Sequence, residues 1–519
     1  MMICPKCGRK FNVTMSFCLE DGTPLRDGAV GLEATTAVLS VPPDDQVTRE
    51  LPDRVDSRSG HGNSVAVLPF VNMSADSDNE YFCDGLAEEL MNALAKIDDL
   101  KVAARTAAFS FRGKNAPLTE IGRALHVNSV LEGSVRKAGS HVRITVQLIN
   151  AADGFNVWSE RYDREMKDIF EIQDEITLAV VDALKVKLLG AEKSAVLKRH
   201  TENFEAYQLY LKGRFFWNKR TGKDLQKAAE YFKQAIEKEP NYAAALSGLA
   251  ETYLLFSGFD VAPADDSMPQ AKAAALAALE IDESLAEAHA ALGFYLTHYE
   301  FDLESSEKEF RRAIELRPDY ATAHQWFAAN LLVAKRFDES LAEMRIAEQL
   351  DPLSPDIGTD HGAALVFARR YDEAIGQLKR TLVREPNFSR AHSYLGWAYG
   401  AKGMYAEAIA EARKALELYD SYYLKGYLGL WLARSGSRDE AQEILAELEK
   451  AAVEDYVRPS TLAVVYIGLG YKEKALEQLE KDLSGRSFTA IYFGVLPEVD
   501  ELRSEPRFKA MLKQMNLPD

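Results

Sequence analysis

Cysteine is scarce in this sequence and unevenly placed. The chain has 519 residues and four cysteines, three of which lie within the first 18 positions. Four thiols are too few for the disulfide framework of a small secreted protein. The first residues also lack the apolar segment of a signal peptide. We therefore expect a reduced, cytoplasmic protein.

Long apolar runs and basic charge are lacking too. No stretch reaches the roughly 18 to 20 apolar residues that a membrane helix needs, so we expect no membrane insertion. The formal net charge is -18. Binding to nucleic acid needs a dense basic face, so we expect no nucleic acid as main partner. Lys6, Arg9 and Lys10 are the only local support for that alternative.

Catalytic motifs are missing as well. The sequence has no G-x-S-x-G, no phosphate loop ending in Gly-Lys-Ser/Thr and no H-E-x-x-H. Gly468 and Gly470 form half of a nucleotide fingerprint, without a third glycine or a preceding strand. We therefore expect a protein that is not an enzyme.

The N-terminal cysteines have the spacing of a metal site. Cys4 and Cys7 enclose a C-P-x-C-G turn, and Cys18 stands three positions before Asp21. Zinc accepts a carboxylate oxygen beside three thiolates, and a segment this short generally needs a metal to fold. The alternatives are a flexible tail and a catalytic thiol, and water could replace Asp21 as the fourth ligand. A filled site of this kind would be structural.

The quoted motifs "CPKCG" and "FCLEDGTPL" resemble the short zinc ribbons that open many bacterial multidomain proteins. That resemblance implies a structural zinc ion in residues 1–26, with Asp21 as a ligand. Residues 27–63 contain three prolines and no aromatic residue, which is typical of a flexible linker.

Residues 64–190 alternate strand-like and helix-like patterns. "SVAVLPF" has strand length, and a helical pattern follows it. Three further strand-like runs are separated by Gly139-Ser140 and Asp153-Gly154, which are typical hairpin turns. The order predicts an α/β domain with a mixed sheet. "VAVLPFVNMSAD", "VLEGSVRKAG" and "VWSERYDRE" resemble the TolB N-terminal-like domain, which implies a regulatory or protein-binding module.

Residues 203–488 repeat with a period of 34 residues. The clearest units are 321–354, 355–388 and 389–422, each with a small residue at unit position 8. Small residues there let two helices approach closely, and proline at unit position 32 ends the second helix. The pattern resembles the tetratricopeptide repeat. It predicts an all-α solenoid of about eight units, capped by a helix within 489–519.

Three histidines recur at unit position 4. His289, His324 and His392 would lie on different helices with axes about 8 to 10 Å apart. Zinc needs its ligands at about 2 Å, so these residues are predicted to pack rather than to bind metal.

The first helices of such a solenoid line a concave groove, the usual peptide-binding surface of the fold. By register, the groove residues are Tyr210, Arg214, Trp217, Phe294, Gln325, Arg390 and Trp397. Aromatic residues with arginine are typical interface anchors. The alternative, that several of the aromatics pack between helices, stays open.

The sequence thus predicts a scaffold that binds a protein or peptide partner. The alternative is a signalling regulator, whose α/β domain binds a ligand or partner and acts on a separate cyclase, kinase or transcription factor. The partner's identity and the oligomeric state are left open.

Overall fold

The computed structural model describes residues 63–518, except 98, 115, 189–192, 195 and 260, and the backbone of three short N-terminal strands. The chain divides into two compact units, Met1–Gly60 and His61–Asp519. In the first unit the strands form an antiparallel sheet in the order β2-β1-β3. Their bounds are Met2–Ile3 (β1), Lys10–Phe11 (β2) and Arg26–Asp27 (β3).

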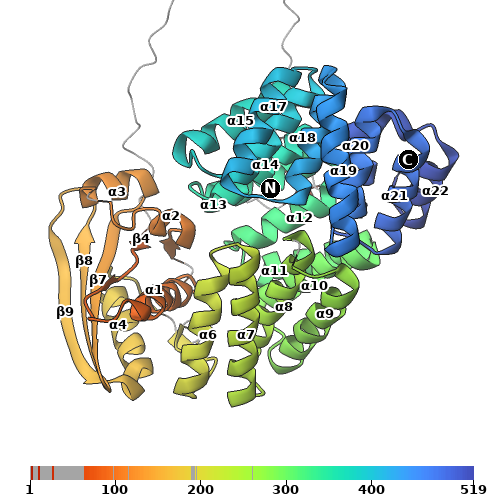
Figure 1. Ribbon diagram of the computed structural model, residues 1–519. Helices are drawn as coiled ribbons and strands as arrows, with labels where there is room; N and C mark the ends of the chain where they lie inside the picture. Colours follow the sequence, from red (N-terminus) through yellow and green to blue (C-terminus); the bar gives the residue numbers. More distant parts are fainter. Residues whose placement is uncertain are drawn as a thin grey trace, which may run out of the picture. The chain divides into compact units, whose positions relative to one another are not determined.

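The second unit begins with a mixed sheet, to which β4, β7, β8 and β9 of Figure 1 belong. The order of its strands is β6-β4-β7-β8-β9. Strands β4, β6 and β7 are parallel, and β7, β8 and β9 form an antiparallel meander. Gly139 and Gly154 have positive φ at its two turns, as the hairpin signals predict. The strands are Asn63–Val67 (β4), Val71–Asn72 (β5, beside β7), Leu100–Val102 (β6), Ser129–Ala138 (β7), His141–Asn150 (β8) and Asn156–Glu165 (β9).

Two long helices, α1 and α4, pack against each other and the sheet. Apolar side chains from α1 are fully buried, and so is Cys83, whose pKa burial raises to about 12. That thiol is an inert part of the core. The helices of this domain are Glu80–Leu94 (α1), Arg105–Phe109 (α2), Leu118–Leu125 (α3) and Ile169–Ala183 (α4).

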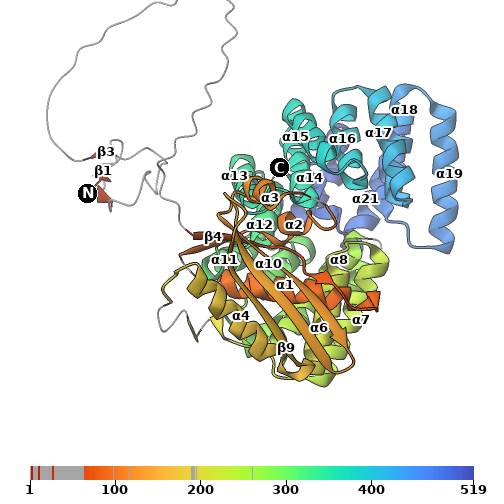
Figure 2. The same cartoon turned by 90° about the vertical axis from the view of Figure 1, so that its left-hand side faces the viewer.

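From Phe204 onwards the described chain forms antiparallel helix pairs, so the structure has the mixed-sheet domain and the mostly helical repeat region that the sequence predicts (Figures 1 and 2). None of the described helices is long and apolar enough to cross a bilayer. The pairs are α6 (Phe204–Trp217) and α7 (Gly222–Lys238), α8 (Ala243–Gly258) and α9 (Ala264–Ile281), α10 (Ala286–Tyr295) and α11 (Leu303–Leu316), α12 (Ala321–Val333) and α13 (Phe337–Leu350), α14 (Pro355–Phe367) and α15 (Tyr371–Arg384), α16 (Ser389–Ala401) and α17 (Tyr405–Leu418), α18 (Tyr422–Ser435) and α19 (Arg438–Glu454), α20 (Pro459–Leu469) and α21 (Lys472–Ser484).

Glycines on several of the first helices allow the two helices of a repeat to pack closely. A Cβ atom at Gly362 would lie 2.5 Å from the Cγ of Leu378, which stands on the second helix of the same repeat. At Gly213 the added atom would lie 2.6 Å from the ring of Phe232. Both distances are too short for a real contact, so the small residues at these positions create the space that the partner side chain fills.

The C-terminal segment returns to earlier repeats. The 3-10 turns η4 (Ala490–Gly494) and η5 (Pro497–Leu502) precede α22 (Pro506–Gln514), which packs on α21. The Arg369 guanidinium donates to the Val495 carbonyl at 2.7 Å, and Arg486 donates to the Tyr299 carbonyl at 2.7 Å. The C-terminal segment thus contacts both the last repeat and earlier repeats.

The α/β domain shares its core with the first repeat. Tyr207 and Leu211 of α6 belong to the same apolar cluster as the sheet. A Cβ atom at Gly85 of α1 would lie 2.6 Å from Leu211, so the two helices are in close contact. The domain thus packs directly against the start of the solenoid.

Candidate binding cavity

A cavity of about 1280 Å³ lies between the first helices of the repeats and the α/β domain. Further walls come from α1, α2, α4, the segment 196–201 and the segment around Tyr492. All seven groove residues that the sequence predicts line this one cavity, namely Tyr210, Arg214, Trp217, Phe294, Gln325, Arg390 and Trp397. The seven residues thus share one cavity, and their role in binding a partner stays a prediction.

The predicted residues of the first repeat are tightly held. Tyr210 packs its ring against Phe232 and Tyr242, with centroids 5.9 and 5.3 Å away. The Arg214 guanidinium lies 4.5 Å from the centre of the Trp217 ring, a cation–π contact. These side chains form part of the cavity wall and of the packing at once.

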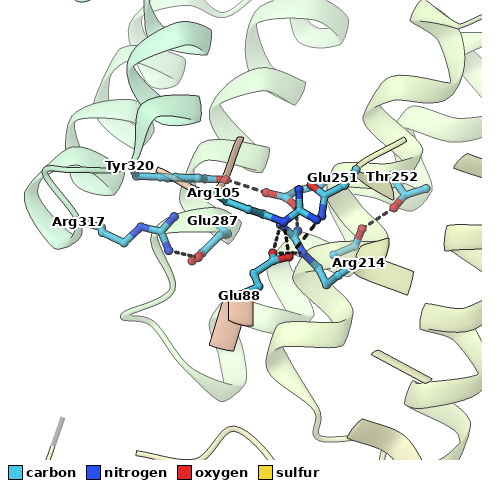
Figure 3. A network of polar contacts seen from close by, with 10 residues as sticks. Glu88, Arg105, Arg214, Glu251, Thr252, Glu287, Arg317 and Tyr320 are labelled. Carbon is cyan, nitrogen blue, oxygen red and sulfur yellow. Dashed lines mark hydrogen bonds and ion pairs between the residues drawn. The ribbon is translucent and has the colours of Figure 1, made fainter. Parts of the chain in front are cut away.

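Glu88 of α1 is the centre of a buried ionic network (Figure 3). Its carboxylate accepts from Arg105 at 2.8 Å and from Arg214 at 3.1 and 3.2 Å. Burial alone would raise the pKa of Glu88, but the two guanidinium groups together hold it below its usual value. Arg214 also donates to Glu251 of α8 at 2.9 Å. One arginine thus joins the α/β domain to two repeats.

Burial has the opposite result at two other carboxyl groups on the cavity wall. It raises the pKa of Glu251, although Arg214 and the Tyr320 hydroxyl, which donates at 2.8 Å, counteract it. Burial, reinforced by the neighbouring charge of Glu88, raises the pKa of Glu89 to about 7. Arg317 and Glu287 form a further ion pair of this wall. The walls of the cavity therefore carry mixed charge in a poorly hydrated setting.

A polar chain connects the middle repeats. Gln325 of α12 donates to Asp360 of α14 at 2.6 Å, and Arg390 of α16 donates to the other oxygen of Asp360 at 2.5 Å. Arg390 also pairs with Asp356. Trp397 stacks on Tyr427 with ring centres 4.2 Å apart. Hydrogen bonds and ion pairs thus connect the first helices of three successive repeats where they line the cavity.

Phe294 mainly packs, the alternative that the sequence left open. It is 4% exposed and stacks on His298 with a centroid distance of 3.9 Å. Trp326 and Phe488 complete the aromatic cluster around it. Burial lowers the pKa of His298 to about 4, so the ring is neutral near pH 7.

The three recurrent histidines hold repeats together through polar contacts. In each case one ring nitrogen contacts a glutamate of the second helix, and the other contacts a backbone carbonyl of the preceding turn. The pairs are His289 with Glu309 at 2.7 Å, His324 with Glu343 at 2.6 Å and His392 with Glu411 at 2.5 Å.

The predicted zinc ligands Cys4, Cys7, Cys18 and Asp21 lie outside the described residues. Within the described part of the chain, no group of three or more His, Cys, Asp or Glu side chains could hold a metal ion. The zinc site accordingly stays a prediction from the sequence.

Sequence reasoning missed the walls that do not belong to the repeat pattern. Glu88 and Arg105 come from the α/β domain, and Tyr492 comes from the C-terminal segment. Arg220 lines the cavity from the turn after α6, where register assigns no groove position. The turns of the last three repeats have glycine at the corresponding position. An arginine at a position where other repeats have glycine was a signal that could have revealed Arg220.

Two family models match the chain. Residues 359–423 match a tetratricopeptide repeat. Residues 61–180 match the second domain of HilA/YgeH-like transcriptional regulators. The match to a tetratricopeptide repeat thus falls within the region of repeated helix pairs, which follows the α/β domain. The similarity of residues 64–190 to the TolB N-terminal-like domain is tested by neither match and stays a prediction.

Curated relatives match parts of the chain. A Rhizobium meliloti protein named "Putative adenylate cyclase 3" is 37% identical over 45% of this chain and 40% of its own length. The transcriptional regulator HilA of Salmonella typhimurium is 29% identical over 29% of this chain and 27% of its own. The TPR repeat-containing protein YpiA of Bacillus subtilis is 25% identical over 49% of this chain and 57% of its own. The chain thus spans less than two thirds of each of these relatives.

Two solved structures match part of the chain. YrrB, described as a TPR protein with an unusual peptide-binding site, is 21% identical over 38% of this chain and 96% of its own, with a TM-score of 0.26. PilF of Pseudomonas aeruginosa is 22% identical over 39% of this chain and 90% of its own, with a TM-score of 0.30.

Proposed function

We propose that this chain is a non-enzymatic, cytoplasmic scaffold that binds a peptide segment of a partner protein in the cavity of its repeats. The observation that carries the proposal is the convergence of all seven register-predicted groove residues on one cavity. Its volume of about 1280 Å³ exceeds the roughly 300 to 1000 Å³ of small-molecule sites, which favours a peptide.

The chemistry of the walls supports the same proposal. Trp217 and Trp397 are 5% and 4% exposed, and both line the cavity. Among the described residues, neither indole N–H has a hydrogen-bond partner. A buried donor without a partner is costly, so a shift of either ring that brings its N–H to a carbonyl of a bound peptide would be favourable. Tryptophan and arginine are also the residues enriched at the centres of protein interfaces.

The test is site-specific photo-crosslinking with the full chain in a lysate of its native cell. A photo-reactive benzoylphenylalanine replaces Gln325 in the cavity or, as the control, Val383 on α15, which is 82% exposed outside the cavity. We expect a defined partner peptide to be cross-linked from position 325 and not from position 383. Trp397→Ala in the same chain is expected to abolish the product while circular dichroism shows unchanged helicity.

Equal cross-linking from both positions, or a product that Trp397→Ala leaves intact, would contradict binding in the cavity. A folded chain that cross-links nothing from position 325 would contradict it as well.

The second candidate is a signalling regulator that acts on a separate cyclase, kinase or transcription factor. The match of residues 61–180 to a transcriptional-regulator domain and the cyclase-named relative favour it. The Glu88–Arg214 contact supplies a physical link from the α/β domain to the repeats. Cross-linking from Val157, an exposed position on β9, tests it. Capture of such an effector from Val157 alone would favour the regulator over the scaffold.

We further propose a structural zinc ion held by Cys4, Cys7, Cys18 and Asp21, on the strength of their spacing. Elemental analysis of the full chain is expected to give about one zinc per chain, and Cys18→Ser is expected to remove it. Asp21→Asn distinguishes the fourth ligand, because zinc affinity falls only if the carboxylate binds. A wild-type chain purified without zinc, and indifferent to added zinc, would contradict the site.

A further inference from the structure

In most repeats the turn between the two helices contains a residue with left-handed backbone. The last three repeats have glycine there, namely Gly403, Gly436 and Gly470, with φ between 76° and 96°. Glycine adopts this conformation without steric cost. Three other repeats instead have a basic residue, and these are Arg220 (φ 53°), Lys335 (φ 58°) and Arg369 (φ 63°). A residue with a Cβ atom is strained in this region, so its side chain needs a separate reason.

The reason is visible for Arg369. Its guanidinium donates to the Val495 carbonyl and, at 2.7 Å, to Asp500, so it fastens the C-terminal segment. Arg220 has no such protein partner: no carboxylate of the described residues lies within 4 Å of its side-chain nitrogens. It is half-buried, lines the cavity and lies over the Trp217 ring at 3.8 Å from the ring centre.

The charges around Arg220 do not neutralise it. Arg214 is paired with Glu88 and Glu251, and Arg390 is paired with Asp356 and Asp360. Burial lowers the pKa of Arg220; Asp356 and Glu251 oppose this shift, whereas Arg214 and Arg390 add to it. A poorly solvated guanidinium without a counter-ion is unfavourable, and an anion from outside the chain would relieve it.

We propose that the cavity selects a peptide that carries a carboxylate, an inference that rests on the proposed function. The carboxylate binds Arg220 beside the Trp217 indole. A guanidinium binds a carboxylate by two parallel hydrogen bonds, so Arg220 fixes both the charge and the position of that group. The aromatic walls then accept the apolar side chains next to it. The acid is either an Asp or Glu side chain or the C-terminal carboxylate of the partner.

The test uses the full chain and a displayed library of random 12-residue peptides, once with free C-termini and once with a neutral C-terminal extension. Arg220→Gly is the test variant, because it removes the guanidinium and relieves the backbone. Lys335→Gly is the matched control: it makes the same exchange at a left-handed turn outside the cavity. Melting temperatures of both variants show whether each chain is folded.

We expect the wild type and Lys335→Gly to select peptides with a carboxylate at one fixed position. Arg220→Gly is expected to lose that preference and to bind the selected acidic peptides at least tenfold more weakly, the effect of losing one charged hydrogen-bond pair. Its melting temperature is expected to equal or exceed that of the wild type. Loss of selection in the library with blocked C-termini identifies the terminal carboxylate as the acid, and retention identifies a side chain.

Two outcomes overturn the inference and leave the proposed function standing. In the first, the peptides that the wild type selects have no acidic residue at a fixed position. In the second, Arg220→Gly binds the selected acidic peptides as tightly as the wild type does. In both cases Trp397→Ala removes binding. A wild-type chain that selects no peptides from either library overturns the peptide-binding function itself.

Discussion

Replacing Glu88 with alanine is expected to loosen the α/β domain from the first repeat. The buried carboxylate accepts from Arg105 and Arg214, and from the Asn218 side chain at 3.3 Å. Removing one partner of a buried ion pair costs about 3 to 5 kcal/mol, because the other charge stays behind without compensation. Arg214 keeps Glu251 at 2.9 Å, so we expect the lower end, about 3 kcal/mol.

Hydrogen exchange of the α1 and α6 amides is the assay, because it reports opening of the junction without assuming two-state unfolding of the whole chain. A loss of about 3 kcal/mol corresponds to exchange on the order of 100-fold faster in both helices. Glu80→Ala is the control on the same helix. Its side chain is 50% exposed in an ion pair with Arg112, so a change below about 1 kcal/mol is expected.

The pH dependence gives a second check on the same variant. The pKa of Glu88 is lowered in the folded chain, so its stabilisation is present above the unfolded pKa of about 4.3 and is lost as the pH falls through the lower folded value. The difference between wild type and Glu88→Ala should therefore shrink in acid. Exchange in α1 and α6 that matches the Glu80→Ala control at neutral pH would refute the network as the basis of docking.

Three further changes test individual contacts. Glu89, with its pKa of about 7, should make stability fall as the pH rises from about 4.3 to 7, and Glu89→Gln should flatten that part of the denaturation profile. His298 has a pKa of about 4, so the free energy of unfolding should decrease as the pH falls from about 6.5 to 4. His298→Phe keeps the stack on Phe294 and should remove this decrease, again measured by denaturation at each pH. Gly362→Val should destabilise by about 1 to 3 kcal/mol in urea denaturation, because its Cβ would overlap Leu378; an unchanged midpoint would contradict the close packing.

The helices and their inner face could be predicted because they depend on short-range periodicity. Small residues recur where the structure shows close approach, as at Gly362. The junction could not be predicted in this way. Glu88 and Arg214 are separated by 126 residues, and no local pattern marks a carboxylate for a partner so distant. The left-handed turn at Arg220 could not be predicted for a different reason. Such a turn is usually recognised by its glycine, and here an arginine adopts the conformation.

The recurrent histidines have glutamate partners at a similar spacing in the sequence, and the prediction of packing did not use that spacing. They were predicted to pack; His324 is buried and His289 and His392 are half-buried, and each also contacts a glutamate. The separations in sequence are 20, 19 and 19 residues for His289, His324 and His392. An offset between two polar residues that recurs from repeat to repeat indicates a contact across the helix pair, just as a recurring small residue indicates close packing. Periodicity in polar pairs therefore carries information that apolar periodicity does not.

The shared walls of the cavity couple ligand binding to domain docking. Arg214 and Arg220 both lie over the Trp217 ring, and Glu88 pairs with the first of them. Glu88 therefore neutralises positive charge that would otherwise attract an acidic ligand at Arg220. The isosteric change Glu88→Gln removes that negative charge, so the affinity for carboxylate-bearing peptides should rise while the affinity for their amide counterparts stays constant. By linkage, a peptide that binds more tightly when this ion pair is absent must weaken the pair by the same factor. Titration calorimetry measures how Glu88→Gln changes the affinity for one acidic peptide and for its amide analogue. Equal changes for both peptides would mean that the junction and the cavity are independent.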